Sequence, residues 1–236
     1  MFNKNREQII KFGLDEALSD INIPLPSKKY LPDWFKSSPR YFDKGQHSIV
    51  TQGKTFKVCM PFTDAMISGY IFELWTDVDV VKNDEIHTLY IKDDRYKVFA
   101  TRDSRSTGDM PTPEGFSNLH YVLRHPLFIQ TPPGYSILVT QPFNRFDLPF
   151  MAMTGIVDSD KEPFFPGNYS LFLKENYEGV IEAGTPMLQI IPFKRDSWKS
   201  IEDSSIVEKG WLASNKSVRK ILGWYRDNAW AKKEYM

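Results

Sequence analysis

The chain has 236 residues, of which 41% are hydrophobic and 25% are charged, as is typical of a soluble protein with a packed core. Lys and Arg together number 30, as do Asp and Glu, so the formal net charge is +0. This balance argues against a general nucleic-acid-binding protein, which needs an excess of basic residues on one face. No apolar run approaches the roughly 20 residues that cross a bilayer, and the polar first residues lack a signal-peptide core. We therefore expect a cytoplasmic protein that makes no membrane contact.

The first segment, residues 1–45, is predicted to be an N-terminal arm. Residues 9–18 have the spacing of a short helix. Beyond them the chain should be extended, because a series of prolines interrupts every regular pattern: Pro24, Pro26, Pro32 and Pro39. Residues 31–35 place two aromatic side chains beside prolines. These aromatics either pack across the body of the protein or form a contact surface for a partner subunit.

The middle of the chain, residues 46–200, is predicted to be one domain of short strands, because no linker rich in Pro, Gly or Ser divides it. Residues 101–117 are predicted to be a long exposed loop. Partly alternating β-branched and aromatic residues, separated by Pro or Gly, indicate a sandwich or barrel rather than alternating strands and helices. The predicted strands cover residues 55–60, 69–81, 86–91, 96–100, 127–130, 135–140, 151–157, 169–173 and 187–191.

Two local features of this domain and the tail can also be predicted. Residues 92–95 read as a hairpin turn, and Cys59, the only cysteine, should be buried in the first strand. Residues 201–236 are predicted to be a helical extension, with an amphipathic helix over 215–235 that begins at Ser214 or Asn215 as N-cap. Apolar residues at helical spacing support that helix: Val218, Ile221, Leu222, Tyr225 and Ala229.

Four segments occur in an order and spacing that resemble a known superfamily: 64–74 with Gly69-Tyr70, 132–135 with Pro-Pro-Gly-Tyr, 155–160 with Gly-Ile-Val-Asp-Ser-Asp, and 182–191 with Gln189. They are similar, in turn, to the Gly-Tyr-Asp-Leu strand, the turn into the central hairpin, the Gly-Val-Ile-Asp-x-Asp motif and the closing strand of the dUTPase and dCTP deaminase superfamily. The chain also resembles an uncharacterised family of bacteria and tailed phages.

The resemblance implies a mainly β fold, a dUTPase-like β-clip barrel of short strands, and assembly as a homotrimer. In that superfamily the first Asp of the Gly-Val-Ile-Asp motif orients the water that attacks the nucleotide phosphate, and Asp158 holds this position here. A carboxylate suits the role because it accepts the proton of the water beside a magnesium-bound triphosphate. Magnesium is therefore implied only if the protein hydrolyses nucleotides. The ligand-binding residues implied alongside are Tyr70, Asn144, Arg145, Asp160 and Gln189.

The sequence departs from the superfamily where phosphate is bound. Residues 141–145, Gln-Pro-Phe-Asn-Arg, replace the Pro-Arg-Ser-Gly motif, so the phosphate-binding Ser and Gly are missing, although Asn144 and Arg145 suit contact with an anion. Lys161 stands where the superfamily has a Tyr. A segment with Trp and Lys replaces the Gly-rich C-terminal arm that covers the phosphates.

The retained residues also have a purely structural interpretation. Asp158 and Asp160 suit a solvated or hydrogen-bonded turn, and Gly134, Gly155 and Gly184 suit tight turns with positive φ. The histidines form no strong metal signature, so we predict no metal site: His47, His87, His120 and His125.

Two functional hypotheses follow. The first is a non-catalytic dUTPase-like scaffold, self-associating, that binds another protein or a small ligand, as a phage accessory protein or virion component would in the host cytoplasm or the virion. The second is a divergent hydrolase or deaminase acting on a nucleotide such as dUTP or dCTP, with Asp158 as base. An enzyme should gather Asp158, Arg145 and the Gly69-Tyr70 strand around one cleft, within a chain or across a subunit boundary.

Overall fold

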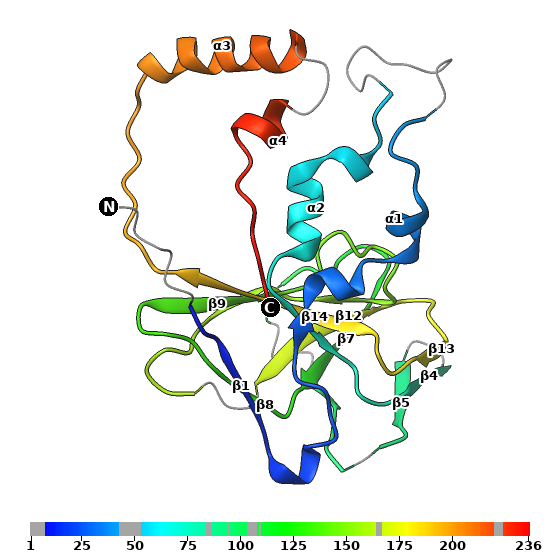
Figure 1. The fold of residues 1–236 in the computed structure, drawn as a ribbon. Coiled ribbons are helices and arrows are strands. Elements are labelled where there is room, and N and C mark those ends of the chain that lie inside the picture. Colours follow the sequence, from blue (N-terminus) through cyan, green and yellow to red (C-terminus); the bar gives the residue numbers. More distant parts are fainter. Residues whose placement is uncertain are drawn as a thin grey trace. The chain divides into compact units, whose positions relative to one another are not determined.

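The computed structural model describes residues 8–42, 53–83, 86–93, 95–102, 108, 110–163, 167–219 and 224–236, and Figure 1 shows the fold. The described chain is mainly β, with antiparallel strands in four sheets. It divides into two compact units. The first contains Met1–Pro32, Met66–Arg195 and Tyr235–Met236, and the second contains Asp33–Ala65 and Asp196–Glu234.

The first unit has two larger sheets, and the four segments that resemble the superfamily all contribute strands to the five-stranded one. The five-stranded sheet has the order β11 (Gly155–Asp158), β9 (Tyr135–Thr140), β14 (Pro186–Lys194), β3 (Tyr70–Glu73) and β2 (Leu25–Pro26). The four-stranded sheet has the order β10 (Phe150–Ala152), β12 (Asn168–Lys174), β7 (Phe116–Arg124) and β6 (Phe99–Thr101). Figure 1 shows β9 beside β14.

Two small sheets complete the first unit. One pairs β1 (Lys11–Leu14) with β8 (Leu127–Gln130), and the other has the order β13 (Gly179–Ile181), β4 (Val78–Asn83) and β5 (Ile86–Ile91). Two short 3-10 helices belong to the N-terminal segment: η1 (Glu16–Leu18) lies between β1 and β2, and η2 (Ser27–Tyr30) directly follows β2.

One hydrophobic core joins the sheets of the first unit. Successive side chains of a strand point to opposite faces, so Ile137 and Val139 of β9 both point inward, and both are fully buried. Leu188 and Ile190 of the neighbouring β14 alternate in the same way, and Leu171 and Leu173 of β12 belong to the same cluster. Burial of apolar surface in this cluster is the main stabilising contribution to the fold.

Gly69, directly before β3, lies close against the backbone of β14. Its φ is +69°, and a Cβ atom at this position would lie 2.1 Å from the carbonyl oxygen of Ile190. Its own carbonyl accepts the backbone N–H of Ser27 at 3.0 Å, just beyond β2. Only glycine therefore allows β3 and β14 to meet here.

The second unit contains several helices and an extended segment. Its helices are α1 (Asp33–Ser37), η3 (Phe56–Val58), α3 (Ser205–Arg219) and α4 (Trp224–Asn228), and α2 (Met60–Ile67) begins in it. The rings of Phe35 and Phe62 stack at 6.3 Å, and Phe56 lies 5.1 Å from Phe62. The carboxylate of Asp64 accepts the indole N–H of Trp230 at 2.8 Å and pairs with Lys233 at 2.6 Å.

Several predictions for the first hundred residues were wrong. Residues 11–14 form a strand rather than a helix, because they pair with β8 from Lys11 opposite Gln130 to Leu14 opposite Leu127, and such pairing overrides local spacing. Residues 55–60 form η3 and the start of α2 rather than a strand, because the Thr55 side chain accepts the N–H of Lys57 and caps the turn. Cys59, which ends that turn, is exposed rather than buried. The hairpin predicted at 92–95 is also wrong, since β4 pairs with β5, and β6 pairs with β7.

Later elements also differ from prediction. The single strand over 151–157 is two strands in different sheets, β10 and β11. Strands β7 and β13 were not predicted. The C-terminal helix begins at Ser205 rather than at Asn215, because the side chain of Asp203 accepts the backbone N–H of Ser205 at 2.9 Å. Part of the predicted helix, residues 220–223, lies outside the described residues, as does His47.

Candidate functional site

The Asp158–Asp160 segment lies against the turn that enters β9. Asp158 is directly opposite Ser136 in the β11–β9 ladder, and the Ser136 hydroxyl donates to the Asp158 carboxylate over 2.5 Å. Asp160 accepts the backbone N–H of Gly134 at 2.9 Å. Between the two acids, the buried hydroxyl of Ser159 lies 3.0 Å from that of Thr131. Hydrogen bonds thus join the Pro-Pro-Gly-Tyr turn and the strand after it to the Gly-Ile-Val-Asp-Ser-Asp segment.

Arg195, directly after β14, completes this arrangement. Its Nη1 atom lies 3.1 Å from a carboxylate oxygen of Asp158 and 3.1 Å from one of Asp160, and its Nη2 pairs with the other Asp160 oxygen. Its backbone N–H donates to the carbonyl of Gly134 at 2.8 Å. We call the group formed by Gly134, Ser136, Asp158, Asp160 and Arg195 the Asp-Arg cluster.

The cluster stabilises both acids in their charged forms. The Arg195 hydrogen bond and the Gly134 N–H lower the pKa of Asp160 to about 2. The Ser136 hydroxyl, followed by the charge of Arg195, lowers the pKa of Asp158. In turn, the hydrogen bond to Asp160 raises the pKa of Arg195. A carboxylate with a lowered pKa is a weaker proton acceptor. The cluster is therefore better suited to holding these turns together than to supplying a catalytic base.

The two acids differ in their exposure to solvent. The side chain of Asp160 is 7% exposed, whereas that of Asp158 is 70% exposed. Asp160 is therefore enclosed by its hydrogen-bond donors, while part of the Asp158 carboxylate faces solvent. Asp158 is the residue of this pair that a water or ligand can reach.

Gln189 braces the interior of the five-stranded sheet. It is fully buried, its Oε1 accepts the backbone N–H of Phe143 at 2.8 Å, and its Nε2 donates to the carbonyl of Ser68 at 2.6 Å. It links the turn after β9 to the residue before Gly69. Buried backbone groups need such partners, which accounts for a glutamine at this position without a ligand.

Arg145 and Asn144 lie in that turn after β9. Asn144 has a φ of +61°, a left-handed conformation that Asn tolerates better than most residues. The Arg145 guanidinium donates to the Asp147 carboxylate from Nη2 at 2.8 Å and from Nε at 2.9 and 3.1 Å, and its Nη1 donates to the carbonyl of Tyr30 at 3.3 Å. The cavity that Arg145 lines beside Tyr30 and Gln189 measures about 10 Å³, room for about one water.

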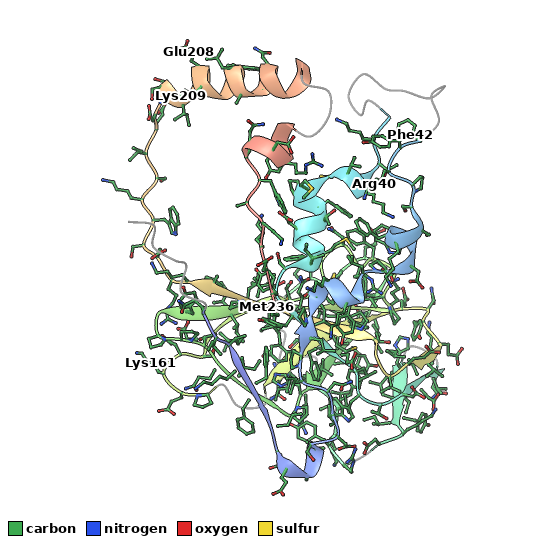
Figure 2. All side chains as sticks on the ribbon, in the orientation of Figure 1. Arg40, Phe42, Lys161, Glu208, Lys209 and Met236 are labelled. Carbon is green, nitrogen blue, oxygen red and sulfur yellow. The ribbon has the colours of Figure 1, made fainter. Side chains whose placement is uncertain are left out.

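Tyr70 contacts other parts of its own chain. Its hydroxyl donates to the backbone carbonyl of Met236 at 3.3 Å, a residue labelled in Figure 2. Its ring lies 5.4 Å from that of Phe12 and 5.9 Å from that of Tyr235, both edge-on. The superfamily resemblance implies that Tyr70 contacts a ligand, but its ring packs against Phe12 and Tyr235 of its own chain.

The predicted site residues fall into two groups within one chain. Asp158 lies opposite Ser136, near the start of β9, whereas Gln189 lies opposite Thr140, at its end. Four residues of a strand span about 13 Å. Asp158 and Asp160 are thus brought together with Arg195, while Asn144, Arg145 and Gln189 gather at the far end of β9. Sequence reasoning missed Arg195, whose only signal is a basic residue directly after the last strand.

The described residues include no group of three or more His, Cys, Asp or Glu side chains arranged to hold a metal ion. His87, His120 and His125 are each buried. Burial lowers the pKa of His125 to about 4, so this side chain is neutral at physiological pH.

None of the described helices is both long and apolar enough to span a membrane. No family model and no curated protein matches the sequence. The dUTPase-like resemblance therefore stays a prediction.

Proposed function

We propose that this protein is a non-catalytic scaffold with a dUTPase-like β-clip unit, and that it acts by binding other protein chains. The observation that carries the proposal is the Asp-Arg cluster. The acid that matches the catalytic position, Asp158, is hydrogen-bonded to Ser136 and ion-paired with Arg195. The motif residues hold two turns and a strand end together, and they do so without a ligand.

The residues at the far end of β9, where the superfamily resemblance implies phosphate contacts, also favour a scaffold over an enzyme. Arg145 is engaged by Asp147 and Tyr30, and Gln189 by Phe143 and Ser68. A nucleotide would have to displace these contacts, and the cavity beside them is far smaller than the roughly 300–1,000 Å³ of ordinary ligand pockets. The chain thus keeps the residues that shape a β-clip and lacks those that bind phosphate.

The test is to measure the thermal unfolding of the full chain with a panel of deoxynucleoside triphosphates and magnesium, alongside their hydrolysis. A nucleotide at ~100 times its dissociation constant would add about 2.7 kcal/mol of stability. We expect no upward shift and no turnover. Hydrolysis that disappears in Asp158→Asn but persists in Asp33→Asn, a matched change at an exposed carboxylate, would overturn the scaffold function.

One observation favours the second candidate, a divergent nucleotide hydrolase or deaminase. The Asp158 side chain is 70% exposed, so its carboxylate is open to a water or to residues of another subunit. In such an enzyme Asp158 would be the base, and a second chain would supply the anion contacts that lie at the far end of β9 in its own chain. Magnesium would then accompany the triphosphate. The hydrolysis assay above separates the two functions.

A further inference from the structure

The chain segment after β14 exposes an unusual amount of apolar surface. Every residue from 194 to 212 is exposed. Within this range Trp198 is 92% exposed and Trp211 is 66% exposed, and four aliphatic residues are each more than half exposed: Ile201, Ile206, Val207 and Leu212. We call residues 196–212 the apolar arm.

The apolar side chains of α3 lie mainly on one face. Residues three and four positions apart are neighbours on a helix face. The pairs Ile206/Gly210, Val207/Gly210 and Val207/Trp211 have this spacing, so the four residues form one stripe. Figure 2 shows the side chains that project from α3 and labels Glu208 and Lys209, whose helical positions lie outside this stripe. A helix with an apolar stripe normally buries that stripe against another element.

The exposed area is large enough for a stable interface. Aromatic side chains bury 150–250 Å² each, so the two tryptophans alone expose roughly 240–400 Å² in each chain. Two copies double that amount, and the four aliphatic residues of each copy bring it toward the ~1,200 Å² at which stable protein interfaces begin.

The charge pattern of this segment favours a second copy of the chain as the occupant of this face. Residues 202–208 contain three acidic residues and no basic one, whereas residues 209–220 contain four basic residues and no acidic one. Two of these acids, Glu202 and Asp203, precede α3, and Glu208 lies within it. If two copies of residues 202–219 run antiparallel about Gly210, the positions of these acids fall opposite the basic second half of the other copy. The same orientation opposes the two helix dipoles favourably. Parallel pairing would place like charges together.

Gly210 lies near the middle of the stripe and suits the centre of such a pair. A Cβ atom added at this position would have no atom within 4 Å, so the backbone is open to a neighbour. Glycine weakens a helix interior, yet it lets a second helix approach closely and makes room for an indole ring. A twofold axis near Gly210 would bring the same surface of both copies together, and such a symmetric contact closes at a dimer.

We infer that the apolar arm is a self-association surface, in which α3 pairs in antiparallel fashion with α3 of a second copy and Trp198 and Trp211 are the main anchors. The inference rests on the scaffold function proposed above, because it names the chain that the scaffold binds. It has its own evidence, in the exposed stripe and the charge pattern, and it can fail separately.

The first experiment is sedimentation equilibrium of the full chain at micromolar concentration. Wild-type protein should have at least twice the mass of one chain. Trp198→Ser and Trp211→Ser should each raise the dissociation constant by about 30-fold or more, as loss of an aromatic anchor does. Phe146→Ser, which removes an exposed aromatic residue of the first unit, is the matched control and should keep the wild-type mass. Circular dichroism should show that all three variants remain folded.

The second experiment tests the orientation by disulfide formation in a Cys59→Ser background. Gly210→Cys should form a disulfide-linked dimer, since antiparallel pairing brings both copies of position 210 together. Ser205→Cys should not, because antiparallel pairing places its two copies about 15 Å apart along the helix axis, beyond the ~7 Å reach of a disulfide. Linkage at both positions would contradict the antiparallel arrangement.

The outcomes for the two proposals differ. A monomeric wild-type chain, or a double Trp198→Ser and Trp211→Ser variant that keeps the wild-type mass, would overturn the self-association surface. Nucleotide turnover by a chain that still self-associates would overturn the scaffold function and leave the surface standing.

Discussion

Asp158 and Ser136 face each other across the β11–β9 ladder, and the serine hydroxyl donates to the carboxylate over 2.5 Å. A residue at a motif position for catalysis is therefore a partner in strand pairing. The neighbouring Asp160 is more enclosed, because it accepts the Gly134 N–H and pairs with Arg195. This difference between the two acids leads to the first prediction.

Asp160→Asn should lower the melting temperature more than Asp158→Asn. The enclosed carboxylate loses an ion pair and weakens its bond to a backbone amide, whereas the exposed one remains open to water. Thermal unfolding at neutral pH and moderate salt measures the difference. Equal shifts for the two variants would show that burial does not distinguish these acids. Asp33→Asn, at an exposed carboxylate, provides the baseline for removing one surface charge.

The Asp-Arg cluster should make stability depend on pH in acid. Because the pKa of Asp160 is lowered from 3.8 to about 2 in the folded chain, its contribution is present above the unfolded pKa and is lost as pH falls toward 2. Melting temperatures of wild type and Asp160→Asn, measured from pH 7 to pH 2, should therefore converge below about pH 4. A difference that stays constant over this range would contradict the lowered pKa.

Three glycine-to-alanine changes should separate the cost of a positive φ from the cost of a Cβ atom that collides with its neighbours. Gly155→Ala meets nothing within 4 Å and has no positive φ, so it should change stability by less than about 1 kcal/mol. Gly134→Ala has open space but a φ of +85°, so it should cost about 1–2 kcal/mol. Gly69→Ala adds a collision with Ile190 and should cost about 2–5 kcal/mol. Urea unfolding of the three variants tests this order.

Gln189→Ala should destabilise the first unit by about 1–3 kcal/mol, because the Phe143 N–H loses its buried partner, whereas the Ser68 carbonyl keeps the Ser27 hydroxyl as a donor. Gln189→Glu should also destabilise it, since a carboxylate cannot donate to Ser68. Asn83→Ala, which removes an exposed amide, should stay within about 0.5 kcal/mol of wild type. Urea unfolding measures these free energies. Equal values for Gln189→Ala and Asn83→Ala would show that the buried hydrogen bonds of Gln189 are dispensable.

The strands of the first unit were predictable where Pro or Gly separates short apolar runs, as in residues 127–140. Strand β7 was missed because Asn118 and His120 interrupt its apolar pattern, although His120 is buried. The start of α3 was missed because it depends on one cap, Asp203, in a polar stretch that has several candidates. Long-range pairing and local capping, rather than periodicity, decided these elements.

The candidate site was predictable only in part, because long-range strand pairing also decides which of its residues meet. Gly-Ile-Val-Asp drew attention to Asp158, and the structure puts that residue beside Asp160 as expected from adjacency. Arg195 is 35 residues from Asp160 in sequence, and only the pairing of β14 with β9 brings it there. The separation of Asp158 from Gln189 follows from strand register, which no residue pattern in this sequence specifies.

At Gly69, directly before β3, the neighbouring backbone of β14 leaves no room for any side chain. Selection for folding alone would keep a glycine there through long divergence, whether or not a reaction survives. Chains related to this one should therefore share this glycine more widely than they share any activity. Its presence in another chain would indicate the geometry of two strands, and the chemistry of that chain would need separate proof.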